Sequence, residues 1–147
     1  VSMVSPTVEE EMEIMRRSQE TDRTAGIIPV LDAPGLADMI RETRGVYMHE
    51  RICRYIAELA KATRENEWTE LGLSPRGTVA LTAMAKACAY LKNRAYVVPS
   101  DVEEVFPCVA AHRIILNMKA KVAHVKVEET VRQILENTEK PALKARR

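Results

Sequence analysis

The chain has 147 residues, 46% of them hydrophobic, so it is long enough to bury a core as a single domain. Aromatic residues make up only 4% of the chain, so the core must be built from aliphatic side chains, as in helical bundles. A net charge of +1 excludes the basic footprint of a nucleic-acid or membrane partner, and three cysteines without C-x-x-C spacing exclude a disulfide framework or a zinc site.

The N-terminal part is predicted to contain one helix and a linker. Thr7 and Glu10 have the spacing of a capping box, which predicts a helix over residues 7–19. Glycine and proline interrupt the helical pattern between residues 22 and 32. We therefore expect a linker there, with an extended piece at residues 27–31.

After residue 33, apolar residues recur every three or four positions, as in helices that bury one face. Helices are predicted in five segments: residues 36–45, 46–64, 74–92, a segment that begins at Pro99, and 127–138. The helix at 74–92 is expected to bury Leu81, Met84, Cys88 and Leu91. Three segments lie between these helices: a loop at 65–73, an extended connector at 94–98 and an unassigned stretch at 114–116. The predicted fold is therefore mainly α, a bundle of about five to six helices with at most short extended connectors.

The helix at residues 74–92 starts with a motif that combines a capped N-terminus and a cation. Ser74 is a suitable N-cap because its hydroxyl can accept a hydrogen bond from the first turn, and Pro75 suits the first helical position. Arg76 follows where the helix dipole favours anions, and Gly77 has no side chain to block an approach to the backbone. An anion bound to both the arginine and the free N–H groups would explain this placement. The structural alternative is a solvated arginine on a well-capped helix.

No other motif indicates catalysis. The sequence contains neither a G-x-x-x-x-G-K-[ST] phosphate loop nor a G-x-G-x-x-G turn. The three histidines lack the spacing of metal ligands, so no metal site is predicted, and the cysteines fall on predicted apolar helix faces as buried, inert thiols. Five methionines at helical spacing are predicted to be core residues: Met12, Met15, Met39, Met48 and Met84. This chain alone is therefore expected not to be an enzyme.

An ordered set of short motifs extends over residues 5–140. Its first part consists of Ser5-Pro6-Thr7 followed by Glu11 and Ile14, then Pro29-Val30-Leu31, Tyr55 and Thr63-Arg64. Its second part consists of Gly72-Leu73-Ser74-Pro75-Arg76, an alanine-rich helix, the run from Asn93 to Val102, and His112-Arg113. Together they resemble the C-terminal helical lid of MoxR-type AAA+ ATPases. Two positions depart from the family: Val98 stands where threonine is frequent, and Gly77 replaces a small residue that has a Cβ.

The resemblance implies a domain organisation. Residues 1–33 would connect the nucleotide-binding core to the lid, residues 34–140 would form the helical AAA+ lid, and residues 141–147 would be a basic tail. The core itself, with its phosphate loop and metal-binding acidic residues, is not in this sequence. The chain is therefore expected to be a lid excised from a larger ATPase.

The resemblance also implies roles for the helix start. Arg76 would be the sensor-2 arginine, close to the terminal phosphates of ATP in its own subunit or in a neighbouring one. Ser74 and Pro75 would hold the helix start in place, and Gly77 would leave room for the nucleotide. None of these residues is expected to bind ATP tightly without the core.

Cofactors and partners follow from the resemblance alone. The parent protein would use ATP and Mg²⁺, and the nucleotide-binding core of the same chain would pack against the lid. The family implies homo-oligomers, commonly hexameric rings, and chaperone-like remodelling, often with a von Willebrand factor A-type partner. The cysteine usage favours a cytoplasmic protein without a nucleic-acid or membrane partner.

Two other classes of protein compete with the lid. A free-standing helical adaptor would bind protein through an exposed groove and leave Arg76 merely solvated. A helix-turn-helix DNA reader would need a basic recognition helix, whereas the helix at 74–92 has only Arg76, Lys86 and Lys92 as cations. The DNA reader is therefore discounted, and an Arg76 without an acidic partner in the bundle would favour the lid over the adaptor.

Overall fold

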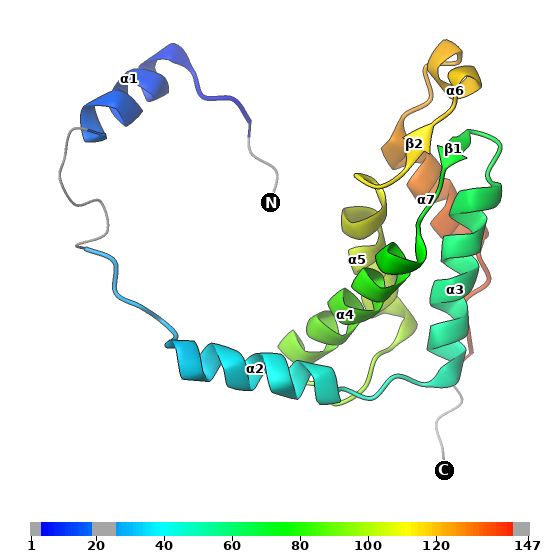
Figure 1. The fold of residues 1–147 in the computed structure, drawn as a ribbon, viewed down its shortest axis with the longest axis horizontal. Coiled ribbons are helices and arrows are strands. Elements are labelled where there is room, and N and C mark those ends of the chain that lie inside the picture. Colours follow the sequence, from blue (N-terminus) through cyan, green and yellow to red (C-terminus); the bar gives the residue numbers. More distant parts are fainter. Residues whose placement is uncertain (1–3, 19–25, 143–147) are drawn as a thin grey trace. The chain divides into compact units, whose positions relative to one another are not determined.

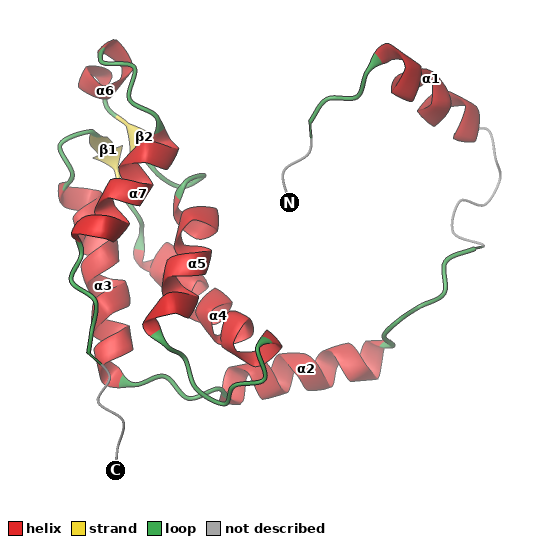
Figure 2. Ribbon diagram, turned by 180° about the vertical axis from the view of Figure 1, so that it is seen from behind, coloured by secondary structure: helices red, strands yellow, loops and turns green. Residues whose placement is uncertain are grey.

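The computed structural model describes residues 4–18 and 26–142 (Figure 1). The chain divides into two compact units, residues 1–36 and 37–147. The described residues contain seven helices and one two-stranded sheet, so the prediction of a mainly α fold is confirmed (Figure 2).

The first unit contains α1 (Val8–Arg17). Its capping box is present, because the Thr7 N–H donates to Glu10 Oε2 at 2.8 Å and the Glu10 N–H donates to Thr7 Oγ1 at 3.3 Å. No residue of α1 is buried, so the expectation that Met12 and Met15 are core residues is wrong. Residues 26–32 form neither helix nor strand, and the preceding part of the expected linker lies outside the described residues.

A second helix, α2 (Ala33–Gly45), begins in the first unit and continues into the second. It is longer than predicted at its N-terminus and ends at Gly45, as expected. Its last turns contact α4, since Tyr90 OH donates to Glu42 Oε2 at 2.6 Å and Lys86 Nζ donates to the Arg44 carbonyl at 2.9 Å.

The second unit is built mainly from four helices (Figure 1). They are α3 (Glu50–Glu65), α4 (Pro75–Leu91), α5 (Pro99–Ala110) and α7 (Val127–Asn137). Their inward faces form one apolar core: Ile52, Tyr55, Ile56 and Leu59 of α3, Leu81, Ala85, Cys88 and Ala89 of α4, Val102, Val105, Phe106 and Val109 of α5, and Val131 and Ile134 of α7. Every one of these positions is an aliphatic residue, an alanine, a cysteine or one of two aromatics, as the composition predicts.

Helix α3 starts four residues later than predicted. The preceding residues are held extended, because the Tyr47 N–H donates to the Ala95 carbonyl at 2.8 Å and the Val97 N–H donates to the Tyr47 carbonyl at 2.9 Å. His49 then caps the helix through Nδ1, which accepts from the Arg51 N–H at 3.1 Å. A bridge between residues almost fifty positions apart thus overrides the local helical pattern.

The loop predicted at residues 65–73 contains a short strand. Strand β1 (Thr69–Leu71) pairs in antiparallel fashion with β2 (Ile115–Leu116), which accounts for the stretch that the pattern left unassigned. One more turn of helix, α6 (Met118–Val122), follows β2 and was not predicted. Asn117 caps α6 and also ties it to the sheet region, since its Nδ2 donates to the Glu67 carbonyl at 2.7 Å.

The buried face of α4 differs from the predicted one. Leu81 and Cys88 are buried as expected, but Met84 is 45% exposed and Leu91 is 72% exposed. Ala85 and Ala89 are fully buried instead. Helix α4 makes its most extensive packing with α5, and the small alanine side chains allow the two helices to approach closely.

Two of the three cysteines also differ from the prediction. Cys88 is buried, whereas Cys53 and Cys108 are exposed. The buried faces of α3 and α5 consist of other residues, so the helical spacing placed Cys53 and Cys108 on the wrong face of their helices.

Candidate functional site

The start of α4 has the capped geometry that its sequence predicts. Ser74 is the N-cap, with φ −73° and ψ 164°, and its Oγ accepts from the Gly77 N–H at 3.3 Å. Pro75 occupies the first helical position, where its missing N–H is no loss. The Thr78 hydroxyl donates to the Ser74 carbonyl at 3.3 Å, which further fixes the first turn.

Arg76 places a cationic side chain in the first turn of α4. Its side chain is exposed, and within residues 4–18 and 26–142 its guanidinium has no hydrogen bond or ion pair. Its backbone N–H is also without a partner there, because the cap bond is used by Gly77 and the first i→i−4 bond is made by Thr78. A guanidinium and an amide N–H on one residue are therefore both available to an anion at the positive end of a helix.

Gly77 allows a close approach of Leu73 to the first turn of α4. A Cβ at this position would lie 2.5 Å from Leu73 Cδ1 and 3.4 Å from Arg113 Cδ. Gly77 is itself buried, so close packing against Leu73 is sufficient to require a glycine here. The role that the resemblance implies for Gly77, leaving room for a nucleotide, stays a prediction.

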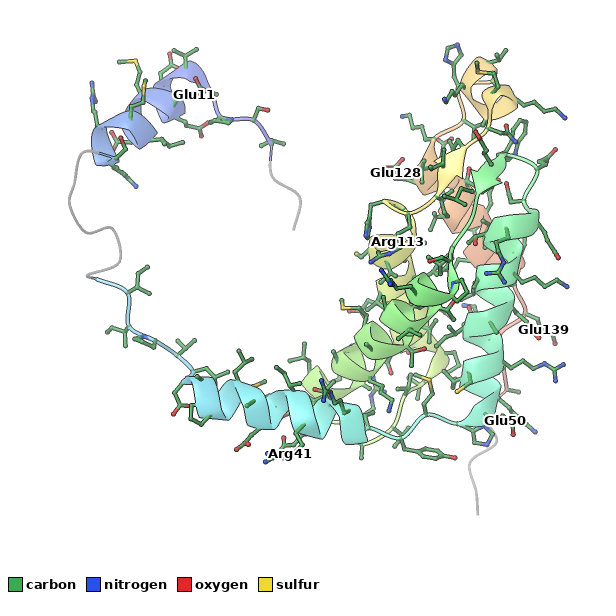
Figure 3. All side chains as sticks on the ribbon, viewed as in Figure 1. Glu11, Arg41, Glu50, Arg113, Glu128 and Glu139 are labelled. Carbon is green, nitrogen blue, oxygen red and sulfur yellow. The ribbon has the colours of Figure 1, made fainter. Side chains whose placement is uncertain are left out.

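Arg113 lies beside the same helix start (Figure 3). It is half-buried, its Nη1 donates to the Val109 carbonyl at 2.6 Å, and it also contacts the imidazole of His112. No carboxylate pairs with Arg113 in the described part of the chain. Arg113 thus adds to the positive charge of Arg76 at this end of α4, and no acid in the described part of the chain neutralises either of them.

The residue before the N-cap is held by α3. The Leu73 N–H donates to Thr63 Oγ1 at 2.8 Å, and Arg64 Nη1 donates to the Leu73 carbonyl at 2.7 Å. Sequence reasoning noted Thr63 and Arg64 only as part of the family pattern and assigned them no contact. Gly72 was the signal that could have revealed it, because a Cβ there would lie 2.6 Å from the Arg64 backbone nitrogen.

The opposite end of α4 holds a buried ion pair. Arg94 Nη1 donates to Asp101 Oδ2 at 2.6 Å, a second bond joins Nη2 to Oδ1, and the Val98 N–H donates to Oδ2 at 3.0 Å. Asp101 is fully buried. Burial alone would raise the pKa of Asp101, but the hydrogen bonds from Arg94 and Val98 lower it below its ordinary value.

Lys92 extends this cluster towards the surface. Its ammonium contacts Glu104 and lies 3.4 Å from Asp101 Oδ1. The hydrogen bond with Glu104 raises the pKa of Lys92 and lowers the pKa of Glu104. Each charge of this cluster is satisfied within the fold, so the cluster is structural and leaves nothing for a ligand.

Other kinds of site find no support in the described residues. Among them, no group of three or more His, Cys, Asp or Glu side chains could hold a metal ion. Residues 4–18 and 26–142 also contain no helix that is long and apolar enough to cross a membrane. The start of α4 is therefore the candidate site.

The chain is similar to several known proteins. The AAA lid domain family matches residues 61–136, which include the end of α3 and the start of α4. YeaC of Bacillus subtilis (strain 168), an uncharacterized protein, is 31% identical over 136 residues, which cover 92% of this chain and 42% of YeaC. The chaperone MoxR1 of Mycobacterium tuberculosis is 29% identical over 149 residues, which cover 95% of this chain and 39% of MoxR1.

A solved structure is similar over the same extent. The crystal structure of an ATPase candidate from Cytophaga hutchinsonii matches with a TM-score of 0.77 and 28% identity, covering 95% of this chain and 45% of that one. The chain spans about two-fifths of the length of YeaC and MoxR1.

Proposed function

This chain belongs to the AAA lid domain family, as a C-terminal lid of the MoxR type, and from that premise we propose that it supplies Arg76 to the nucleotide site of a larger AAA+ ATPase. The relatives named MoxR and the similarity to an ATPase candidate support an ATPase as the parent protein. Arg76 would act as the sensor-2 residue, on the nucleotide of its own subunit or of a neighbour.

The observation that carries the proposal is the unpaired Arg76. A cation at the positive end of a helix is not explained by helix stability, since the dipole favours anions there. The described residues offer it no acidic partner, although the same unit pairs Arg94 with Asp101. This combination favours a lid over a free-standing adaptor, in which a solvated Arg76 would have no role.

The chemistry of phosphoryl transfer suits this arrangement. Negative charge spreads over the oxygens of the transferred phosphoryl group, and a guanidinium can stabilise it with several N–H donors. The first turn of α4 adds the positive end of a helix dipole. Such electrostatic stabilisation requires a helix start that is already in place, and Ser74 and Pro75 provide it.

The parent protein would use ATP together with Mg²⁺. The described residues contain no cluster of metal-ligating side chains, so we propose that the nucleotide-binding core supplies the ligands of the metal. Mg²⁺ neutralises phosphate charge when it is bound, and Arg76 would add a further positive charge to the site.

The test is Arg76→Ala in the full-length parent, with Arg132→Ala as the matched control. Arg132 is also exposed and also has no ion pair in the described residues, but it lies on α7. We expect Arg76→Ala to lower the rate of ATP hydrolysis at least about 100-fold, as the loss of a transition-state cation does. Arg132→Ala should leave it unchanged, and wild-type turnover in Arg76→Ala would contradict the proposal.

The isolated chain should neither hydrolyse ATP nor bind it tightly. Isothermal titration calorimetry of the 147-residue chain with ATP measures this directly. A dissociation constant in the micromolar range would mean that the start of α4 binds nucleotide without a core, which contradicts a site shared with the rest of the parent.

The division of the chain and the partners complete the proposal. Residues 1–33 would connect the core to the lid, 34–140 would form the lid, and 141–147 would be a basic tail. The boundary between the two compact units, at residues 36 and 37, lies close to the first of these boundaries. We further propose a cytoplasmic, chaperone-like remodelling ATPase that assembles through core and lid into homo-oligomers, with a hexameric ring and a von Willebrand factor A-type partner as the specific forms to test. Sedimentation of the full-length parent with ATP would measure its oligomeric state.

A further inference from the structure

Leu73, the residue before the N-cap of α4, has both its backbone N–H and its carbonyl hydrogen-bonded to side chains of α3. Thr63 Oγ1 accepts from the Leu73 N–H at 2.8 Å, and Arg64 Nη1 donates to the Leu73 carbonyl at 2.7 Å. Thr63 is fully buried, and its own hydroxyl donates to the Ala60 carbonyl at 2.7 Å, so the acceptor is held in one orientation. The last turn of α3 therefore determines where Leu73 lies.

The backbone passes unusually close to α3 at this point. A Cβ on Gly72 would lie 2.6 Å from the Arg64 backbone nitrogen and 2.6 Å from the Thr63 carbonyl carbon. Because these are backbone atoms, they cannot move aside as a flexible side chain would. A glycine is therefore required, and the contact between α3 and the segment before α4 is a built feature of the fold.

Leu73 in turn contacts the turn that carries Arg76. Its side chain is fully buried and packs directly against Gly77, where a Cβ would lie 2.5 Å from Leu73 Cδ1. Arg64 and Pro75 also line one groove between α3 and α4. A displacement of Leu73 would therefore move both the N-cap and the first turn of α4.

The guanidinium of Arg64 donates to a backbone carbonyl and not to a carboxylate. Its described hydrogen bond goes to a neutral carbonyl, and no carboxylate in residues 4–18 and 26–142 pairs with its guanidinium. A long cationic side chain at the end of α3, where the helix dipole favours it, is thereby used to hold a neighbouring segment.

We propose that Arg64 is a positioning residue for Arg76. Together with Thr63 it fixes Leu73, and through Leu73 it fixes the Ser74 cap and the direction in which Arg76 leaves α4. This inference rests on the proposed function of Arg76 and adds a residue that does not itself contact the nucleotide.

The test compares Arg64→Met with Arg51→Met in the full-length parent. Arg51 lies on the same helix and also donates to a backbone carbonyl, that of Ala142 at 2.8 Å, so it is a matched control. We expect Arg64→Met to lower kcat about tenfold with little change in KM for ATP, because a misplaced Arg76 would stabilise the transition state less than a correctly placed one. Arg64→Lys, which retains a cationic donor for the carbonyl, should recover most of kcat, and Arg51→Met should match the wild type.

A double variant separates this inference from the proposed function. If Arg64 acts through Arg76, then Arg64→Met should lower kcat no further in the Arg76→Ala background. A further tenfold loss there would overturn the positioning role. Wild-type turnover in Arg64→Met, with Arg76→Ala inactive, would overturn this inference alone, whereas wild-type turnover in Arg76→Ala would overturn the proposed function.

Hydrogen exchange in the 147-residue chain gives a readout that is independent of activity. The Gly77 N–H is protected by its bond to Ser74 Oγ. We expect it to exchange faster in Arg64→Met and unchanged in Arg51→Met, and equal protection in both would overturn the inference. If Arg64→Met does not fold, Thr63→Val against Thr63→Ser makes the same comparison, since only Thr63→Ser keeps the acceptor for the Leu73 N–H.

Discussion

The two ends of α4 each have an arginine beside them, and the two arginines are used in opposite ways. At the C-terminal end, Arg94 donates two hydrogen bonds to Asp101, whose carboxylate is completely buried. At the N-terminal end, Arg76 is exposed and has no acidic partner in the described residues. The fold thus pairs the arginine beside a buried carboxylate and leaves Arg76 unpaired at the positive end of a helix, where the dipole does not favour a cation.

The polar contacts around the two arginines also differ. The Arg94–Asp101 pair closes the turn between α4 and α5, where Asp101 also accepts from the Val98 N–H at 3.0 Å. At the start of α4, the neutral cap of Ser74 and the bond from Arg64 to the Leu73 carbonyl organise the backbone. Polar contacts at the C-terminal end neutralise charge, whereas at the N-terminal end they fix the backbone that carries the exposed Arg76 side chain.

The largest expected effect compares Arg94→Met with Arg76→Met in the 147-residue chain. Arg94→Met leaves a buried carboxylate without its main partner, which should lower the free energy of unfolding by about 3 kcal/mol. Arg76→Met removes no contact within the described residues and should change the free energy of unfolding by less than about 0.5 kcal/mol. Urea denaturation followed by circular dichroism measures both, and equal losses would abolish the distinction between the two ends.

A pH titration tests the same pair through Asp101. Because the pKa of Asp101 in the fold is lower than its ordinary 3.8, its ionised form stabilises the fold above that value. This stabilisation should be lost as the pH falls below about 4 and through the lower pKa of the folded state. Asp101→Asn removes this titration, so its free energy of unfolding should fall less steeply between pH 5 and pH 3 than that of the wild type. Identical slopes would show that Asp101 is not the group that responds.

A smaller effect is expected at Asn93, which directly follows the C-cap residue of α4. Asn93 has φ 55°, in the left-handed region, and the Arg94 N–H donates to the Ala89 carbonyl at 3.0 Å while the Asn93 N–H donates to the Tyr90 carbonyl at 2.9 Å. These two bonds form a Schellman motif. Asn93→Ala should lower the free energy of unfolding by about 1 kcal/mol, whereas Asn93→Gly should be close to neutral. A stable Asn93→Ala would mean that the backbone strain at this end is smaller than its φ indicates.

The sequence predicted those parts of the fold that depend on local signals. The caps at Thr7 and Ser74 and the prolines at 75 and 99 act within one turn, so the starts of α1, α4 and α5 were predicted closely. The strands and the start of α3 depend on pairing between distant segments, such as Thr69 with Leu116, which no local pattern contains. The buried face of α4 was predicted wrongly because alanines pack against α5 more closely than larger side chains allow.

The candidate site also combines local features, which could be predicted, with contacts between distant segments, which could not. Ser74, Pro75 and Arg76 are adjacent in sequence, so their arrangement was predictable from propensity and capping alone. The bond from Arg64 to the Leu73 carbonyl joins two elements across a tight backbone approach, and the packing of Arg113 on Gly77 comes from a third element. In the sequence, only the glycine at position 72 indicated that α3 and the segment before α4 approach closely.

The smallest expected effect concerns the cap of α5, beside the Arg94–Asp101 pair. Val98 is the N-cap and makes no side-chain cap bond, although Asp101 accepts from the Val98 N–H as the second half of a capping box would. Val98→Thr supplies the missing hydroxyl with nearly the same shape, so the free energy of unfolding should rise by about 0.5 kcal/mol. Val98→Ala is the matched control, which removes apolar contact and adds no hydroxyl. Equal stability of Val98→Thr and the wild type would mean that Asp101, which accepts from the Val98 N–H, already satisfies the start of α5 without a side-chain cap.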